Sequence, residues 1–281
     1  MRLGLFVFLS IGCWTAATAF AGQSSTTVVL SEIPVAARNA IQARVGDGKL
    51  GSIEKTSQGG EIVYDVGLTA GNGQERDFTV ADDGTLLSVE VTLAETPAAV
   101  QKSIQTLAKS GKLESIDKEM DGSDTTYDIG LKGSTGTDEG FVIDDDGALL
   151  SREIALPEAP EAVRKTVQAE LGSGQLKSIS KMFDAEGVTY DVEAGGGGDQ
   201  EKAFTVAEDG KLVSRRMTLA EVPPPARRTI TEHLGDGKIL RIDRSYIETK
   251  GVMPYEVQGR KDGKPFDFSV GPRGRFLGMN N

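Results

Sequence analysis

The sequence predicts an α+β protein made of four tandem repeats, each with one helix packed on a four-stranded antiparallel sheet. The first observation is a fixed period: proline, glycine and tyrosine each recur at intervals of 63 residues. The recurring residues are Pro34, Pro97, Pro160 and Pro223; Gly48, Gly111, Gly174 and Gly237; and Tyr64, Tyr127 and Tyr190, with Tyr255 displaced by two residues. The second observation is that one helical pattern and four strand patterns follow each other inside every period. Repeats are therefore predicted at residues 26–90, 91–153, 154–216 and 217–281.

Residues 1–21 have the form of a secretory signal peptide. Arg2 is a short positive region, residues 3–14 are a short apolar core, and residues 19–21 read Ala-Phe-Ala, which fits the small-x-small cleavage site. We expect cleavage after Ala21 and a periplasmic or secreted protein. Lipid modification of Cys13 is an alternative, which Ser10 disfavours because a lipobox usually has leucine there. The apolar core is too short to span a membrane, and no later run is longer.

Each repeat is expected to open with a helix that starts at its proline, because the first helical turn does not need the missing N–H group. The residues three, seven and eleven positions after the proline are apolar and fall on one helical stripe. In the second repeat these residues are Val100, Ile104 and Ala108, and charged or polar residues lie between them. A glycine such as Gly111 then ends or follows the helix.

Four strands are expected to follow each helix. Around the first tyrosine, Ile62, Tyr64 and Val66 alternate with Val63 and Asp65, which is the period of a half-buried antiparallel strand. Asp-Gly pairs at 83–84, 146–147 and 209–210 predict hairpin turns between the third and fourth strands.

Composition and charge exclude several classes of function. The net charge is −11, and the chain carries 42 acidic against 31 basic residues, so nucleic-acid binding by the body of the protein is not expected. From Pro223 onward the balance reverses, with 11 basic and 7 acidic residues. The only cysteine is Cys13, in the expected signal peptide, so disulfides and thiolate metal sites are excluded from the mature chain. We expect no cofactor.

The acidic residue after each repeated tyrosine is the candidate binding feature. These residues are Asp65, Asp128, Asp191 and Glu256. Strand alternation points them away from the helix, so they are expected to line the open face of the sheet. One hypothesis is a column of carboxylates for a cationic ligand or a basic partner. The alternative is a charged, solvated sheet face that keeps the protein soluble. No nucleophile or metal-ligand set accompanies these residues, so no catalytic residue and no metal site is assigned.

The repeated unit resembles the PepSY-like family, whose fold is that of the β-lactamase-inhibitor protein. The resemblance is carried by the helix start Pro97-Val100-Ile104, the Gly111-Leu113-Ile116 step, the tyrosine–acid strand and the Asp-Gly turn. It implies an exported, non-enzymatic binding module, because members are associated with inhibiting or holding extracytoplasmic peptidases and β-lactamases. The four units exceed the usual two, and the mature chain has no tryptophan to anchor a tight interface.

The sequence therefore predicts an exported binding protein without enzymatic activity, acting through its sheet face and loops. Its expected partner is another extracytoplasmic protein, peptidase-like or a component of the envelope. The alternative function is low-affinity binding of a cation or small ligand by the repeated acidic row.

Overall fold

The computed structural model describes residues 25–280, except 59–60, 109–110, 123, 134–137, 196–200, 250 and 262–263. The expected signal peptide and Cys13 lie outside these described residues. Four helices are present among them: α1 (Val35–Val45), α2 (Ala98–Leu107), α3 (Glu161–Leu171) and α4 (Pro224–Leu234). Three short 3-10 helices precede the first three: η1 (Leu30–Glu32), η2 (Leu93–Glu95) and η3 (Leu156–Glu158).

Strands make up most of the described chain. They are β1 (Thr26–Thr27), β2 (Lys49–Gln58), β3 (Glu61–Thr69), β4 (Glu75–Ala81), β5 (Leu86–Glu90), β6 (Lys112–Asp121), β7 (Asp124–Lys132), β8 (Asp138–Asp144), β9 (Leu149–Glu153), β10 (Gln175–Asp184), β11 (Gly187–Gly195), β12 (Glu201–Ala207), β13 (Leu212–Arg216), β14 (Lys238–Ser245), β15 (Tyr255–Lys261), β16 (Lys264–Val270) and β17 (Phe276–Met279).

The predicted fold class is wrong in its architecture. The protein is mostly β, and the 17 strands of the described residues form one antiparallel sheet, which is not four repeats of one helix on a four-stranded sheet. The predicted repeats are joined because β5 pairs with β6, β9 with β10 and β13 with β14. A separate sheet would have left the N–H and C=O groups of each edge strand unpaired, and these junctions satisfy them. We call residues 26–90, 91–153, 154–216 and 217–281 segments 1 to 4, and the three strand pairs junctions 1 to 3.

The helices form where the sequence provides a proline and an apolar stripe. Each helix directly follows the proline of its segment, whose extended backbone precedes the first turn. In segment 2, Val100 and Ile104 of α2 are buried against Ile116, Tyr127 and other apolar residues of the sheet. Burying one such side chain stabilises the fold by about 1.5–3 kcal/mol. A similar buried cluster lies under the helix of each segment.

A glutamate fixes the short turn between each strand and the following helix. In segment 2, the backbone N–H and the hydroxyl of Thr92 both donate to Glu95, each at 2.8 Å. Arg76 Nη1 donates to the same carboxylate at 3.0 Å. The backbone and side-chain hydrogen bonds lower the pKa of Glu95 to about 2. Glu32, Glu158 and Glu221 bind the backbone N–H of the residue three positions earlier in the same way.

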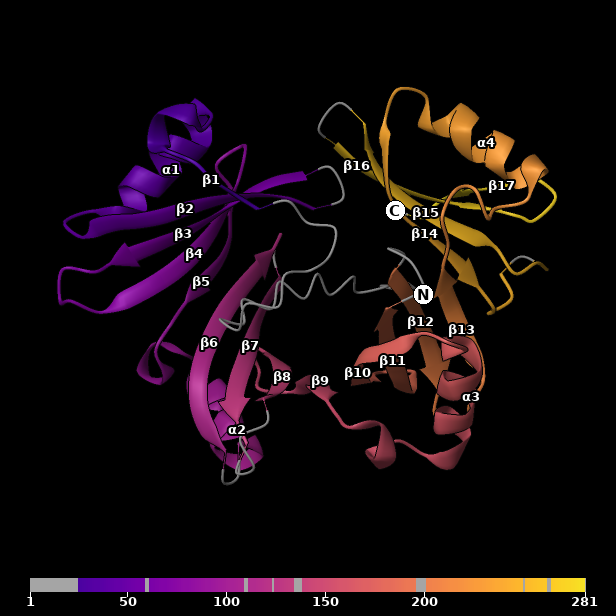
Figure 1. Ribbon diagram of the computed structural model, residues 1–281, viewed down its shortest axis with the longest axis horizontal. Helices are drawn as coiled ribbons and strands as arrows, with labels where there is room; N and C mark the ends of the chain where they lie inside the picture. The colour runs from indigo at the N-terminus through magenta and orange to yellow at the C-terminus, as the bar shows by residue number, and fades with distance from the viewer. Residues whose placement is uncertain are drawn as a thin grey trace.

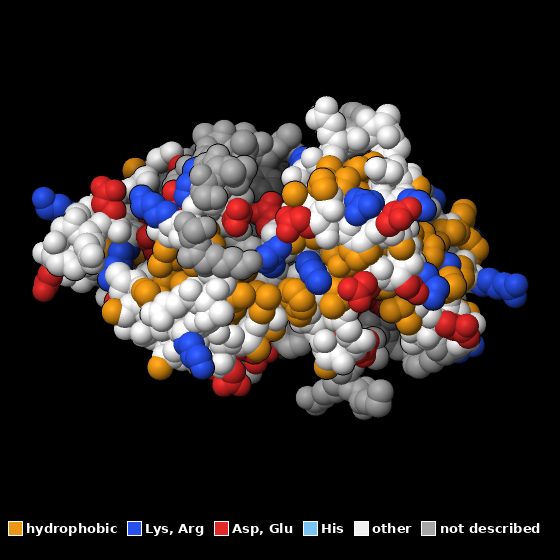
Figure 2. Space-filling model, turned by 90° about the horizontal axis from the view of Figure 1, so that it is seen from below, with side chains coloured by type: hydrophobic (Ala, Val, Ile, Leu, Met, Phe, Trp, Pro, Cys, Tyr) orange, Lys and Arg blue, Asp and Glu red, His pale blue; other side chains and the backbone are white. Residues whose placement is uncertain are grey.

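The sheet has two different faces. Figure 1 shows the four segments in four quarters of the view, with the helices at the periphery and the opposite side of the sheet turned towards the middle. We call this helix-free side the inner face. Seen from below, the surface carries Lys and Arg side chains interspersed with Asp and Glu (Figure 2).

Candidate binding face

The structure places the four residues of the predicted acidic row on the inner face. Tyr64 and Val66 pack into the core beneath α1, so Asp65 between them points to the opposite side of β3. The same alternation holds for Asp128 on β7, Asp191 on β11 and Glu256 on β15.

The acidic row does not form one site. Successive members are four strands apart, and at about 4.8 Å per strand this corresponds to about 19 Å along the sheet. Each acidic residue therefore has its own surroundings, set by the neighbours directly opposite it on the adjacent strands. The row consists of four separate positions that differ in chemistry.

The neighbours of Asp65 are mostly hydroxyl groups. Asp65 lies opposite Glu54 on β2 and Thr79 on β4. Its carboxylate accepts hydrogen bonds from Thr79 Oγ1 at 2.8 Å and from Thr56 Oγ1 at 3.3 Å. Burial raises the pKa of Asp65, and these hydrogen bonds oppose the shift. In segment 3, Thr205 Oγ1 donates to Asp191 at 2.7 Å in the equivalent arrangement.

Junction 1 gathers four carboxylates, which we call the junction cluster: Glu90, Asp117, Glu119 and Asp128. Glu90 on β5 lies opposite Asp117 on β6, and Asp117 lies opposite Asp128 on β7. Glu119 is two residues further along β6 and therefore on the same face. Directly opposite residues in an antiparallel pair have Cβ atoms about 4.5–5.5 Å apart, so these like charges repel each other.

The electrostatics of the junction cluster reflect both burial and repulsion. Burial, followed by repulsion from Asp128 and Glu90, raises the pKa of Asp117 to about 7. Burial and repulsion from Asp128 and Asp117 raise the pKa of Glu119 to about 8. Burial and Glu153 raise the pKa of Asp128 to about 6. At neutral pH the cluster therefore carries a proton population that ordinary carboxylates would have lost.

Two details leave the cluster poorly satisfied within the part of the chain that the structure describes. Glu119 Oε1 is shielded from solvent and receives no hydrogen bond from any described residue. Asp128 lies opposite Val142, whereas Asp65 and Asp191 lie opposite the hydroxyls of Thr79 and Thr205. A buried acceptor without a donor is unfavourable by about 1–3 kcal/mol, and more when it is charged.

Sequence reasoning missed three of the four cluster residues, namely Glu90, Asp117 and Glu119. The available signal was the spacing Asp117-Lys118-Glu119 beside Ile116, which places both acids on the face opposite the core. The contribution of Glu90 was not visible, because it depends on the pairing of β5 with β6 across two predicted repeats.

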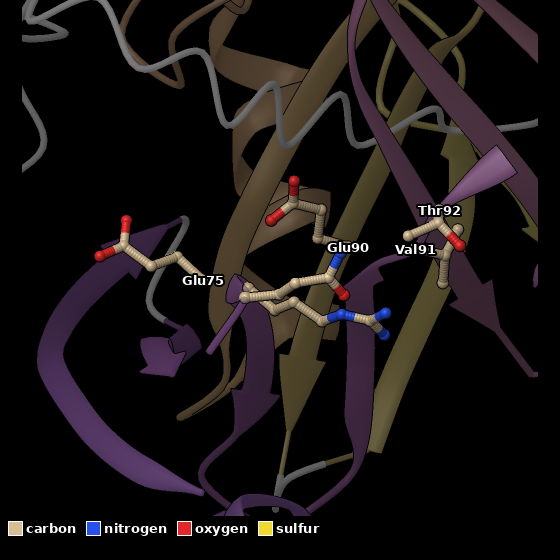
Figure 3. A pocket seen from close by; sticks show the side chains of 6 residues that line it. Glu75, Glu90, Val91 and Thr92 are labelled. Carbon is tan, nitrogen blue, oxygen red and sulfur yellow. The ribbon is translucent and has the colours of Figure 1, made fainter. Parts of the chain in front are cut away.

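A shallow hollow lies beside junction 1. It is lined by Gln74, Glu75, Arg76, Glu90, Val91 and Thr92. Figure 3 shows that the carboxylates of Glu75 and Glu90 point in different directions and do not converge on a common point. Paired carboxylates that act as general acid and base must both reach the reacting group. The hollow therefore lacks the arrangement that this chemistry needs.

The acidic row could hold a metal ion, and an apolar helix could span a membrane. Within the described residues, no group of three or more His, Cys, Asp or Glu side chains is arranged to hold a metal ion. None of the described helices is both long enough and apolar enough to cross a membrane.

Comparisons with known proteins give no family for the chain. No protein-family model and no curated protein matches it. Similar solved structures include a DUF2874 family protein from Bacteroides ovatus, with 12% identity over 43% of this chain and 86% of that one, at a TM-score of 0.34. A DUF2874 family protein from Bacteroides uniformis shows 18% identity over 43% and 88%, at a TM-score of 0.33. A third, provisionally described as a periplasmic protein of the same family from Bacteroides vulgatus, shows 15% identity over 46% and 95%, at 0.29.

These three structures carry the DUF2874 name, and the expected resemblance to PepSY-like or β-lactamase-inhibitor-like proteins finds no specific support in them. At these TM-scores the likeness establishes neither a shared fold nor a shared function.

Proposed function

We propose that this protein is an exported, non-enzymatic binding protein that engages another protein of the cell envelope through its inner face. The observation that carries the proposal is the junction cluster, where half-buried carboxylates in lateral register have raised pKa values, and where Glu119 Oε1 accepts no hydrogen bond from the described residues. A surface in this state is stabilised by a partner that brings positive charge.

The signal-like N-terminus supports export, and the acidic inner face supports a basic partner surface, such as that of a peptidase-like or other envelope protein. The proposal of a non-enzymatic role is supported by the diverging carboxylates of the hollow beside junction 1. Aromatic anchors are scarce, at 6% of residues, so we expect a partner interaction governed by charge and of moderate affinity.

Affinity capture from a native envelope extract, with the mature chain as bait, tests this proposal. We expect a specific protein to be retained and to be lost when Asp117→Asn and Asp128→Asn are introduced on the inner face. The matched control carries Glu161→Gln and Glu232→Gln, which replace the same number of carboxyl groups by amides at exposed positions on α3 and α4. Capture that is insensitive to the inner-face change, or equally sensitive to the control, would contradict the proposed surface.

A second candidate function is low-affinity cation binding by the acidic row. The specific observation in its favour is the lateral register of Glu90, Asp117 and Asp128 across three adjacent strands. A ligand that binds only the folded state stabilises it by RT ln(1 + [L]/Kd), so calcium at ten times its Kd would add about 1.4 kcal/mol. Thermal melting at increasing calcium, with magnesium as the comparison, measures this. An unchanged melting temperature at millimolar calcium would remove this candidate.

A further inference from the structure

The turn between the last two strands of each segment has the same geometry in all four segments but not the same charge. Each turn contains a glycine with positive φ: 88° at Gly84, 80° at Gly147, 86° at Gly210 and 82° at Gly274. The two residues before this glycine are acidic in segments 1 to 3, namely Asp82 and Asp83, Asp145 and Asp146, and Glu208 and Asp209. In segment 4 they are Pro272 and Arg273, and Arg275 follows the glycine. The turn is therefore acidic in three segments and basic in the fourth.

The connection between β14 and β15 also differs from its equivalents. Two residues separate β2 from β3, β6 from β7 and β10 from β11, whereas residues 246–254 separate β14 from β15. In this longer connection Ile247 is 49% exposed and Met253 is 42% exposed. The N–H of Thr249 donates to the carbonyl oxygen of Val252 at 2.7 Å. A hydrogen-bonded backbone thus presents two apolar side chains to solvent.

The long connection and the basic turn lie at the same end of the sheet. Tyr255, which begins β15, lies opposite Val270, which ends β16. Residues 246–254 therefore enter the sheet at the end where residues 271–275 leave it.

The two connections are adjacent, and together they form a surface that we call the segment 4 tip. Val252 Cγ2 lies 3.7 Å from the position that a Cβ on Gly271 would occupy. Among the described residues no ion pair involves either arginine of the turn. The tip consists of four exposed side chains: Ile247, Met253, Arg273 and Arg275.

We propose that the segment 4 tip docks this protein on an anionic lipid surface. Apolar side chains that bind a membrane peripherally enter the boundary between headgroups and acyl chains, and cations beside them are attracted to anionic lipids. Ile247 and Met253 supply the apolar contact, and Arg273 and Arg275 supply the charge. This role goes beyond the proposed function, because the tip is at the end of the strands and the inner face runs along them.

An acidic protein is the other occupant that would match the charge of the tip, and the size of the tip disfavours it. A specific protein interface uses about 20–30 residues on each side. The two connections of the tip contain only nine and five residues, 246–254 and 271–275. A lipid surface needs only a few inserted side chains with cations beside them.

The acidic remainder of the chain does not prevent this docking. The net charge of −11 would repel an anionic surface at very low salt. At about 0.1 M salt the screening length is about 10 Å, so the charges nearest the membrane dominate. Segment 4 occupies its own quarter of the view in Figure 1, and from Pro223 onward the sequence has 11 basic and 7 acidic residues.

Sedimentation with lipid vesicles tests the proposal on the mature chain. One set of vesicles contains phosphatidylcholine with about 30% phosphatidylglycerol, and the other contains phosphatidylcholine alone, both at about 0.1 M salt. We expect partition onto the anionic vesicles to be at least about fivefold greater. Equal partition onto the two sets, or partition onto neither, would overturn the proposal.

A charge variant locates the basic part of the contact. Arg273→Gln with Arg275→Gln should weaken partition onto the anionic vesicles at least about fivefold. The matched control, Lys102→Gln with Lys112→Gln, removes two exposed basic side chains from segment 2 and should change partition less than about twofold. Equal losses in the variant and its control would show a general charge effect and would refute the tip as the contact.

An apolar variant and a fluorescent reporter test insertion. Ile247→Ser with Met253→Ser should also weaken partition at least about fivefold, whereas Val29→Ser with Val35→Ser, at exposed positions of segment 1, should have less than about a twofold effect. The only tryptophan of the sequence lies in the expected signal peptide, so an introduced tryptophan reports its own surroundings. Ile247→Trp should shift its emission to shorter wavelength when anionic vesicles are added, and Val35→Trp should not. An unshifted emission from position 247 would contradict insertion.

The lipid surface and the proposed function fail separately. Asp117→Asn with Asp128→Asn on the inner face should leave vesicle partition unchanged while partner capture is lost. Soluble poly-glutamate tests the acidic protein: binding that needs Arg273 and Arg275, without partition onto vesicles, would overturn the lipid surface in favour of such a partner. Circular dichroism and melting of each variant establish that it is folded.

Discussion

Acidification should stabilise this protein between pH 8 and pH 6, because the junction cluster binds protons more tightly when folded. Asp117 and Glu119 have pKa values raised to about 7 and about 8 in the folded state, from ordinary values of 3.8 and 4.5. A raised pKa of a carboxyl group means that the folded state holds protons that the unfolded chain has released. The free energy of unfolding therefore falls as the pH rises through this window.

The magnitude follows from the proton difference. Each extra proton held by the folded state changes the free energy of unfolding by about 1.36 kcal/mol per pH unit. From pH 8 to pH 6, Glu119 contributes over both units and Asp117 over about one, which gives an upper limit of about 4 kcal/mol. Coupling between the carboxyl groups spreads the titration over a wider pH range and solvent screening weakens it, which reduces this to about 2 kcal/mol.

Thermal melting by circular dichroism at constant ionic strength measures the effect. About 2 kcal/mol corresponds to a rise in melting temperature of about 4–8 °C from pH 8 to pH 6 in a chain of this size. Asp117→Asn with Glu119→Gln should flatten this dependence and raise stability at pH 8. His233→Gln, which removes the only histidine of the sequence, should leave the dependence intact. A wild-type melting temperature that is constant or rises with pH would refute the reasoning.

Three further predictions concern packing, the backbone and the ion pair at junction 3. Ile230→Ala empties a fully buried position under α4 and should lower the free energy of unfolding by about 2–5 kcal/mol in urea, whereas Glu232→Ala on the exposed side should change it by less than about 0.5 kcal/mol. Gly147→Ala should reduce the melting temperature markedly, because its φ of +80° disfavours a side chain and the added Cβ would lie 2.8 Å from a carbonyl oxygen of α2; a neutral result would mean that this turn can move. Arg241→Ala leaves its carboxylate partner buried without that cation and should lower the free energy of unfolding by about 2–3 kcal/mol, and the added change Asp243→Asn should restore most of it; equal losses in the single and double variants would contradict a charge effect.

The local elements could be predicted from the sequence because their causes are local. The helices begin directly after Pro34, Pro97, Pro160 and Pro223, where a fixed backbone precedes an apolar stripe. The side of the sheet on which Asp65 lies follows from alternation with Tyr64 and Val66, which any half-buried strand obeys.

The assembly of the sheet could not be predicted in the same way. The pairing of Ser88, Val89 and Glu90 with a strand of the next segment depends on the strand register and on the path of the intervening helix. Neither of these can be read from composition or periodicity. The junction cluster was missed for the same reason. Its members become neighbours only when two segments that look independent in the sequence share one ladder of hydrogen bonds.

The order of the strands has a consequence for how the chain folds. Each described strand is hydrogen-bonded to the strand that precedes it in the sequence. The pairing of these strands therefore needs only contacts between residues that are close in the sequence. Such low sequence separation between contacting residues favours rapid folding, even in a protein dominated by strands. The N-terminal hairpins can form while the C-terminal part of the chain is still being synthesised. Each later hairpin can then pair with a strand that is already folded.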